Sequence, residues 1–267
     1  MRLHLRMVYQ IVIIAVFLAV ALYRSDLVIQ EFDFARQRMA GDWDEQLHTI
    51  FLFLLMLLIL VIATAVISLK TTVIFDLAVV LTGLAIGYMV EAWGTRYGLW
   101  SYYTNEKPPL WIIPVWPLGA LLTDRVNTIW GNIFSNHCHR ATVTRCYWFV
   151  AISFLAIIVI FTLPASSNPA TYIGILLLGI TLTYRPQPET YFPLLIIAAI
   201  LVLPADYWGT ASDCWHYYSY PTNNMLSIDT GVAFGIAFDA VVVLSILRVS
   251  KKIETRLCNE SGRLSSR

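Results

Sequence analysis

Long runs of apolar residues recur along this chain and limit the folds that it can adopt. Several approach the roughly 20 residues that an α-helix needs to cross a bilayer, where each backbone polar group must find its partner within the segment. Only 13% of the residues are charged, about half the share found in soluble domains. The sequence therefore predicts an all-α integral membrane protein with about eight transmembrane helices, over about residues 7–23, 49–69, 72–90, 108–131, 146–163, 172–184, 191–203 and 226–247.

Polar segments separate these runs. Residues 24–48 and 132–145 are expected to be polar loops, and residues 248–267 to be a basic, frayed tail. Residues 19–21 resemble a signal-peptidase site, but the preceding apolar run is long for a signal peptide, so a retained helix is favoured over cleavage. The chain then divides into residues 1–48 (first helix and loop), 49–131 (repeat one), 132–171 (polar loop and fifth helix), 172–247 (repeat two) and 248–267 (tail).

Each of the two predicted repeats contains one copy of a motif of 13 residues. Residues 91–103 read Glu-Ala-Trp-Gly-Thr-Arg-Tyr-Gly-Leu-Trp-Ser-Tyr-Tyr, and residues 206–218 read Asp-Tyr-Trp-Gly-Thr-Ala-Ser-Asp-Cys-Trp-His-Tyr-Tyr. A constant offset of 115 residues relates the two copies and also carries Asp124 onto Asp239. The ungapped match predicts an internal duplication that brings two acids and many aromatic side chains to one place.

The distribution of lysine and arginine predicts how the chain is oriented. With eight helices, 13 of these residues fall on the side of both termini and five on the other side. Since basic residues favour the cytoplasmic side, we expect a multi-pass cell-membrane protein with both termini cytoplasmic and both motif loops on the outer side. The duplication is then parallel, four helices plus four, with a pseudo-twofold axis along the membrane normal.

Glu91 and Asp206 are the leading candidates for chemistry. Each ends a predicted helix, where a lone acid would be interpreted as a solvated helix end, but their matched positions favour a function. A carboxyl enclosed by tryptophans loses its hydration and favours the protonated form, which can protonate an alkene or epoxide. Asp239 could be a second proton donor or a polar group that packs the two halves together. Asp76 and Asp124 are further acids within or near the membrane.

The aromatic residues of the motifs have two interpretations. Tryptophan and tyrosine favour membrane interfaces, where they form belts. A belt does not require fixed spacing in two copies, however, and the faces of aromatic rings in a pocket stabilise a carbocation. We therefore predict a substrate-binding set that consists of Trp93, Tyr97, Trp100, Tyr102, Trp116, Trp208, Trp215 and Tyr217.

Other kinds of site have little support. The net charge of +1 argues against a nucleic-acid surface. The segment His137-Cys138-His139 resembles a metal cluster, but adjacent ligands rarely reach one ion, so a polar loop is favoured there. Phosphate-binding loops and Asp-rich diphosphate motifs are absent from the sequence. We expect no metal and no cofactor.

The motif at residues 91–103, followed by Leu110-Trp-Ile-Ile-Pro-Val-Trp116, resembles the carotenoid-biosynthesis membrane family that includes the bisanhydrobacterioruberin hydratases. The duplicated layout also resembles the heterodimer-type lycopene cyclases and the integral-membrane terpenoid cyclases. The resemblance covers about residues 73–126 and 190–241, and it places Glu91 and Asp206 on the acid positions. The Pro-x-Glu-Glu signature of the cyclases is replaced here by Pro117-Leu-Gly-Ala120.

These observations predict acid-catalysed hydration or cyclisation of a lipophilic isoprenoid such as a carotenoid. Glu91 would deliver the proton, Asp206 would hold or receive it or orient water, and the tryptophans would stabilise the cation. One alternative is a membrane transporter or lipid-binding protein, for which helices broken in both halves would be expected. Another is a structural subunit of a membrane complex, which predicts that Glu91 and Asp206 lie far apart.

Overall fold

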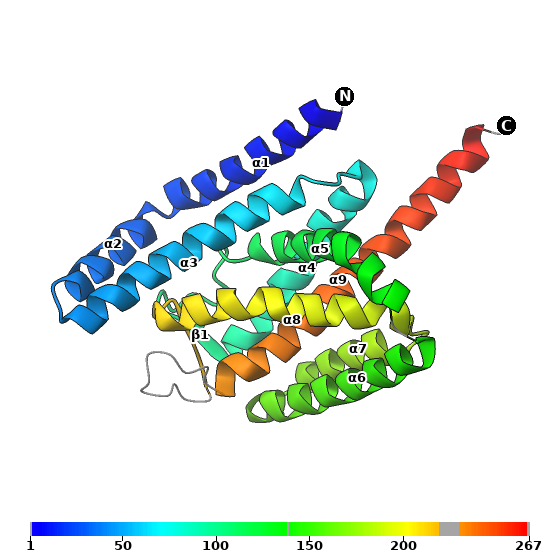
Figure 1. The fold of residues 1–267 in the computed structure, drawn as a ribbon. Coiled ribbons are helices and arrows are strands. Elements are labelled where there is room, and N and C mark those ends of the chain that lie inside the picture. Colours follow the sequence, from blue (N-terminus) through cyan, green and yellow to red (C-terminus); the bar gives the residue numbers. More distant parts are fainter. Residues whose placement is uncertain (1, 138, 219–229, 266–267) are drawn as a thin grey trace.

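The computed structural model describes residues 2–137, 139–218 and 230–265, and in these residues the chain is almost entirely helical (Figure 1). The α-helices are α1 (Arg2–Tyr23), α2 (Ser25–Met39), α3 (Trp43–Ile67), α4 (Val73–Arg96), α5 (Val115–His137), α6 (Arg140–Thr162), α7 (Pro169–Thr183), α8 (Pro188–Ala211) and α9 (Thr230–Ser265). A short 3-10 turn, η1 (Leu163–Ala165), follows α6, and the two strands are β1 (Trp100–Tyr102) and β2 (Trp215–Tyr217).

Six helices of the described residues are long and apolar enough to cross a membrane: α1, α3, α4, α6, α8 and α9. Large apolar side chains also face outward, as Leu22 and Phe149 do with exposures of 76% and 75%. A surface of this kind is suited to lipid rather than to water. The all-α class is confirmed, and a multi-pass membrane protein fits it. The number eight stays a prediction, because α7 is shorter than the six and α5 is not among them.

The prediction of a polar loop over residues 24–48 is wrong. Helix α2 occupies most of that segment and packs against α3. Leu27 and Ala35 are buried, and the ring of Phe32 lies 6.2 Å from that of Phe53 on α3. Charged residues are interspersed with the apolar ones along this segment, so its composition resembled that of a loop. Asp42 then caps α3 by accepting a hydrogen bond from the backbone N–H of Glu45 at 3.0 Å.

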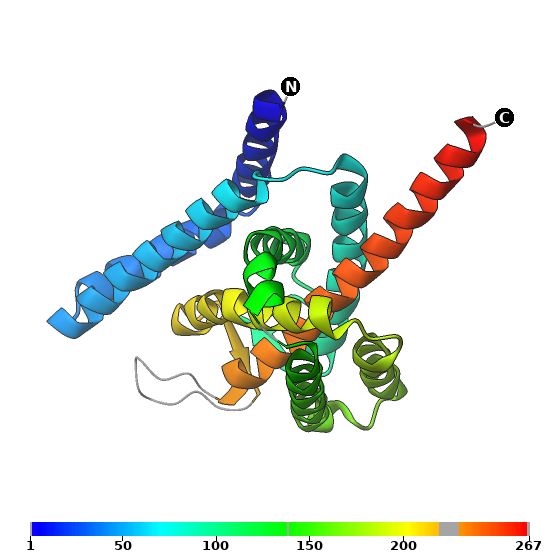
Figure 2. The same cartoon turned by 45° about the vertical axis from the view of Figure 1, so that its right-hand side comes forward.

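Three further boundaries differ from the predictions. The fourth apolar run begins with turns over residues 109–114, and α5 starts only at Val115, because closely spaced prolines interrupt the backbone ladder. The predicted loop 132–145 is largely helical, being shared between α5 and α6. The predicted frayed tail is wrong as well, since α9 continues to Ser265 and projects beyond the other helices (Figures 1 and 2). An ion pair between Lys251 and Glu254 at 2.6 Å supports that polar extension.

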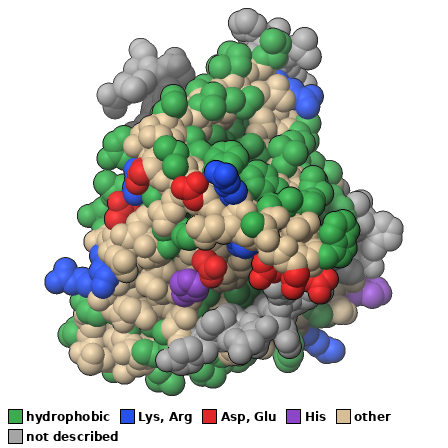
Figure 3. Space-filling model, turned by 90° about the vertical axis from the view of Figure 1, so that its left-hand side faces the viewer, with side chains coloured by type: hydrophobic (Ala, Val, Ile, Leu, Met, Phe, Trp, Pro, Cys, Tyr) green, Lys and Arg blue, Asp and Glu red, His purple; other side chains and the backbone are tan. Residues whose placement is uncertain are grey.

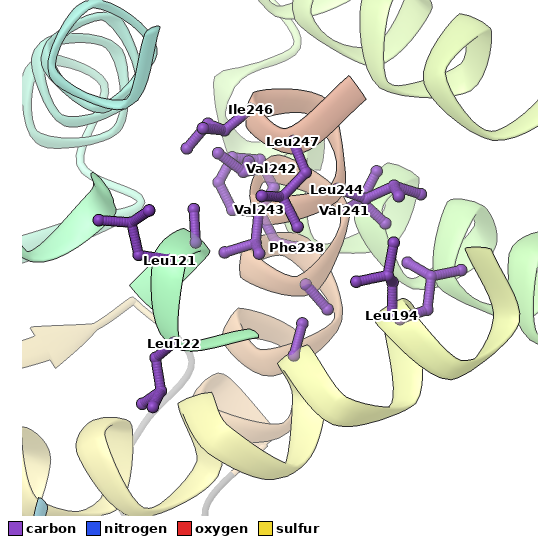
Figure 4. Packing of buried hydrophobic residues seen from close by; sticks show 14 of the residues in the cluster. Leu121, Leu122, Leu194, Phe238, Val241, Val242, Val243, Leu244, Ile246 and Leu247 are labelled. Atoms are coloured by element: carbon purple, nitrogen blue, oxygen red, sulfur yellow. The ribbon is translucent and has the colours of Figure 1, made fainter. Parts of the chain in front are cut away.

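Helix α9 is the centre of the molecule. Between Phe238 and Leu247 nearly all of its apolar side chains are buried, facing α4, α5 and α8 on several sides (Figure 4). A helix that is buried all round belongs in a core. Helices α1, α2 and α3 flank one side of this core, while α6 and α7 cover another (Figures 1 and 2).

The two strands lie beside the N-terminal part of α9, at the end away from Ser265 (Figure 1). Figure 3 views the molecule from that side, where acidic and basic side chains form a band between apolar surfaces. Arg24, between α1 and α2, pairs with Glu106, just after β1, at 2.7 Å. This ion pair ties the first two helices to the segment that follows the first motif.

Candidate functional site

The two copies of the motif meet in a two-stranded antiparallel sheet. Strand β1 follows α4 and β2 follows α8, so that each strand belongs to one copy. The register places Trp100 opposite Tyr217, Ser101 opposite His216 and Tyr102 opposite Trp215. Since Trp100 matches Trp215 and Tyr102 matches Tyr217 in the repeat, the tryptophan of each copy faces the tyrosine of the other. The pairing brings together residues that lie 113 to 117 positions apart in the sequence.

Both copies end their helix in the same way. The backbone N–H of Leu99 donates to the carbonyl of Gly94 at 2.9 Å, and that of Cys214 donates to the carbonyl of Gly209 at 2.8 Å. The residue before each donor has left-handed backbone, with φ of 69° at Gly98 and 61° at Asp213. This is the Schellman arrangement that terminates many helices. It turns the chain back, so that the aromatic residues of each strand lie over the end of the helix that carries the acid.

A glycine in each copy allows a tryptophan ring to lie against the helix. A Cβ added at Gly94 would lie 2.1 Å from the ring of Trp100, and one added at Gly209 would lie 2.0 Å from the ring of Trp215. Neither ring could keep its place beside alanine, because real Cβ contacts are never so short. The close packing of Trp100 and Trp215 therefore requires the glycine of the Trp-Gly pair in each motif.

Gly94→Ala and Gly209→Ala are each expected to lower the free energy of unfolding by about 1–3 kcal/mol, since the new methyl group would displace a packed ring. Gly119→Ala is the matched control, because nothing lies within 4 Å of a Cβ added there on α5. Alanine within a helix should make that control as stable as the parent or slightly more so. Thermal unfolding in detergent measures all three, and equal losses in Gly94→Ala and Gly119→Ala would contradict the packing described here.

Glu91 is buried at the end of α4 and is held by three donors. One carboxyl oxygen accepts hydrogen bonds from Trp100 Nε1 at 2.9 Å and from the Tyr102 hydroxyl at 3.0 Å, and the other accepts one from Trp116 Nε1 at 3.1 Å. The side chain is 3% exposed, and no basic group pairs with it among the described residues. The carboxyl is thus oriented by neutral hydrogen-bond donors, and no basic side chain among the described residues holds it in the ionised form.

Asp206 occupies the matched position at the end of α8. It is 5% exposed, and the hydroxyl of Tyr217 donates to its Oδ2 at 3.1 Å, as Tyr102 does to Glu91. Thr95 and Thr210 donate to the backbone carbonyls of Glu91 and Asp206 at 2.6 and 2.9 Å. The local contacts of the two acids therefore correspond in side chain and in backbone.

Asp239 of α9 joins the two acids. It is half-buried and lies close enough to Asp206 and Glu91 for their charges to act on it. Helix α9 approaches closely because Gly235 has no side chain: a Cβ there would lie 2.5 Å from the Tyr217 hydroxyl and 3.1 Å from Asp206 Oδ2. The sequence prediction named these three carboxyls, and the structure brings them into one cluster.

Aromatic rings surround this cluster. The ring of Trp93 meets that of Trp100 edge-on at 6.3 Å, and Trp208 meets Trp215 in the same way at 6.4 Å. Trp93 also donates a hydrogen bond to Thr171 at 3.2 Å. Of the predicted aromatic set, Trp100, Tyr102, Trp116 and Tyr217 bind an acid directly, Trp93, Trp208 and Trp215 pack around them, and Tyr97 packs against the core at the end of α4.

The sequence prediction missed the ring at the centre of the aromatic set. Phe161 of α6 is fully buried and stacks on Trp100 with ring centroids 6.3 Å apart and an interplanar angle of 2°. It also contacts Tyr217 at 5.9 Å and Phe238 at 6.0 Å. Phe161 lies outside both motifs, in an ordinary apolar run. The spacing of Phe234 and Phe238 on α9, just before Asp239, was a signal that could have been used.

Cys214 lies between α8 and β2, where its thiol is buried. Burial raises the pKa of Cys214 to about 12, and burial likewise raises the pKa of Tyr103, whose backbone N–H donates to the Cys214 carbonyl at 3.2 Å. We expect Cys214 to react with a maleimide at pH 8 at least about tenfold more slowly than the exposed Cys258, because the reactive form is the thiolate. Peptide mapping by mass spectrometry distinguishes the two sites, and equal rates would contradict the paired strands.

Asp76 and Asp124 lie in a different part of the molecule from the Glu91 cluster. Both pair with the guanidinium of Arg125, which is 2% exposed. Asp76 also accepts hydrogen bonds from the Tyr9 hydroxyl at 2.8 Å and from the backbone N–H of Thr72 at 3.1 Å. These acids therefore join α1, α4 and α5 at the start of α4, whereas Glu91 lies near its end.

The segment His137-Cys138-His139 resembles a metal cluster in the sequence. Within residues 2–137, 139–218 and 230–265, no group of three His, Cys, Asp or Glu side chains is arranged to hold a metal ion. Cys138 of the segment 137–139 lies outside the described residues.

No protein-family model, curated protein or solved structure matches this chain. The resemblance to carotenoid-modifying proteins thus stays a prediction that rests on the motif residues.

Proposed function

We propose that this chain is a membrane-embedded enzyme that modifies an isoprenoid, such as a carotenoid, by acid catalysis at a terminal double bond. The observation that carries the proposal is that Glu91 and Asp206 are buried among aromatic rings and accept hydrogen bonds from neutral groups, with the half-buried Asp239 beside them. Paired carboxyls in one enclosed site can divide into a proton donor and a proton acceptor. The rings can stabilise a carbocation without trapping it.

The proposed reaction begins with proton transfer from the Glu91 carboxyl to one carbon of the double bond, which leaves a cation on the other carbon. In hydration, water adds to that cation and the resulting oxonium gives up a proton. In cyclisation, a second double bond of the substrate attacks the cation, and a neighbouring C–H gives up a proton. Asp206, supported by Asp239, accepts the released proton in either case; Asp206 then gives this proton up to solvent, and Glu91 is protonated again from solvent. This scheme uses no metal and no cofactor.

We further propose that the fold is a parallel repeat of four helices plus four, with a pseudo-twofold axis along the membrane normal. The matched helix ends, Gly–Trp contacts and acid–tyrosine hydrogen bonds support it. Both termini would be cytoplasmic and the motifs would face the outer side, as the distribution of basic residues predicts. A substrate with a long apolar chain could then enter from the bilayer, since the site lies at the end of membrane-crossing helices.

The contacts weigh against the two rival functions. A structural subunit would have left the two acids apart, but β1 and β2 are hydrogen-bonded to each other. A transporter would be favoured by helices broken in both halves. Helix α8 instead continues through Pro193 and Pro204, and α9 is continuous over its described length.

The proposal is tested by expressing the chain in a host that makes acyclic carotenoids and comparing extracts by liquid chromatography and mass spectrometry. Hydration gives a product heavier by one water, and cyclisation gives an isomer of the substrate. Asp206→Asn should lose most of this product. Asp213→Asn is the matched control, because Asp213 is exposed and asparagine tolerates the same left-handed backbone. Full activity in both Glu91→Gln and Asp206→Asn would refute the proposal.

A further inference from the structure

A second polar site lies at the opposite end of α9 from the paired strands. A cavity of about 550 Å³ opens there between the start of α4, the middle of α5, the start of α8 and the second half of α9. Six basic side chains line it: Lys70, Arg125, Arg248, Lys251, Lys252 and Arg256. The two acidic side chains that line it are already engaged, since Asp124 pairs with Arg125 and Glu254 with Lys251. The cavity thus has an excess of positive charge.

Arg125 forms the buried part of this site. It is 2% exposed, and its two terminal nitrogens pair with Asp76 and Asp124. Its Nε is buried and has no hydrogen-bond partner among the described residues. A buried donor without a partner is costly. Arg125 is thus a buried polar part of the cavity wall, with its charge balanced by Asp76 and Asp124.

Arg248 is held in place on the opposite wall. Its guanidinium donates to the carbonyl of Tyr184 at 2.8 Å and to that of Thr181, and it lies over the ring of Tyr191 with 4.6 Å to the centroid. These contacts use backbone carbonyls and a ring, so its positive charge is not neutralised by an acid. Gln187 and Thr190 place the start of α8 at the same cavity, and the start of a helix favours anions.

Lys70, Lys252 and Arg256 remain at the rim. All three are exposed, and none makes an ion pair with another described side chain. Basic residues at one end of a membrane protein are common, but that rule does not require them to converge on a cavity with a buried arginine. Convergence of this kind is typical of phosphate recognition, in which several cations and a helix start surround one anion.

We propose that this cavity binds a phosphate-bearing anion, which is either the headgroup of an anionic lipid or a soluble phosphate compound. The site is separate from the Glu91 cluster, so the proposal does not depend on the function proposed above. Lys70, Lys252 and Arg248 contact the anion, and Arg125 lines the cavity from within. A bound lipid would fit the apolar side chains of Leu194, Leu244 and Leu247, which also line the cavity.

The test uses the full chain, purified in detergent and stripped of lipid. One arm titrates inorganic pyrophosphate and follows thermal unfolding. The other follows binding of phosphatidylglycerol against phosphatidylcholine by native mass spectrometry. Lys70→Gln/Lys252→Gln removes two rim charges, and Arg36→Gln/Arg96→Gln is the control, because it removes two exposed charges away from the cavity. The first variant should bind at least about tenfold more weakly, since each charge-assisted contact contributes about that factor.

Tight binding of pyrophosphate that is weakened only by Lys70→Gln/Lys252→Gln supports the site with a soluble anion as its ligand. Selective binding of phosphatidylglycerol with the same dependence supports it with a lipid headgroup as its ligand. The proposal is overturned if neither anion binds, or if both variants weaken binding equally, since general attraction to a positive surface would then explain the result.

Discussion

Glu91→Gln is expected to lower product formation by about 10²- to 10⁴-fold, the usual contribution of a positioned general acid. Glutamine keeps the shape of the side chain, and its carbonyl oxygen can still accept the hydrogen bonds from Trp100 and Tyr102, whereas its amide NH2 replaces the oxygen that accepts from Trp116. It cannot, however, deliver a proton to carbon. The fold should therefore survive while the chemistry is lost. Product per milligram of purified protein, measured by liquid chromatography, gives the comparison.

Two controls make this result specific. Thermal unfolding of Glu91→Gln should show no more than the loss of the Trp116 hydrogen bond, about 1–3 kcal/mol, which separates lost chemistry from lost structure. Asp213→Asn should retain full product formation, since its carboxyl is exposed and takes no part in the cluster. If Glu91→Gln kept more than half of the parent activity, Glu91 could not be the proton donor. Asp239→Asn should have an intermediate effect if it supports Asp206.

Asp76→Asn is expected to lower the free energy of unfolding by about 3–5 kcal/mol, because it removes one partner of a buried ion pair. Arg125 would keep Asp124, whose side chain is 27% exposed, but would lose the better-buried carboxylate. Tyr9 would lose the carboxylate that accepts its hydrogen bond between α1 and α4. Unfolding by heat or denaturing detergent measures the change.

Glu254→Gln is the matched control for that prediction. Its pairing with Lys251 is exposed, with the lysine side chain 70% accessible, and such pairs contribute at most about 1 kcal/mol. A change below about 0.5 kcal/mol in Asp76→Asn would show that the buried pair does not join α1, α4 and α5 as described.

Much of the candidate site could be predicted from the sequence, because its residues lie in two motifs with one constant offset. The match of Glu91 with Asp206, and of Tyr102 with Tyr217, was sufficient to predict that they converge. The antiparallel pairing of β1 with β2 could not be predicted, since three-residue strands have no period to detect. Phe161 was missed for a related reason: a phenylalanine in an apolar helix has no sequence signature that distinguishes a site from a core.

The fold, too, could be predicted from the sequence only in part. Apolar runs predicted the all-α class and most helices, because length and hydropathy dominate in a bilayer. Helix α2 was missed, since the charged residues interspersed along residues 25–39 made the segment resemble a loop. The link between Asp76 and Arg125 spans 49 residues of sequence, and no local pattern indicates it. Such contacts depend on how α4 and α5 cross, which composition does not determine.

The central claim is that the clustered acids protonate a carbon of the substrate, and isotope incorporation tests it most directly. The purified chain would be supplied with its acyclic isoprenoid in deuterated buffer, and the product examined by mass spectrometry and deuterium NMR. We predict one carbon-bound deuterium in each product molecule, formed by the parent and by Asp213→Asn but not by Glu91→Gln. Product that forms without carbon-bound deuterium would contradict the account, because the reaction could then not begin with a proton from Glu91.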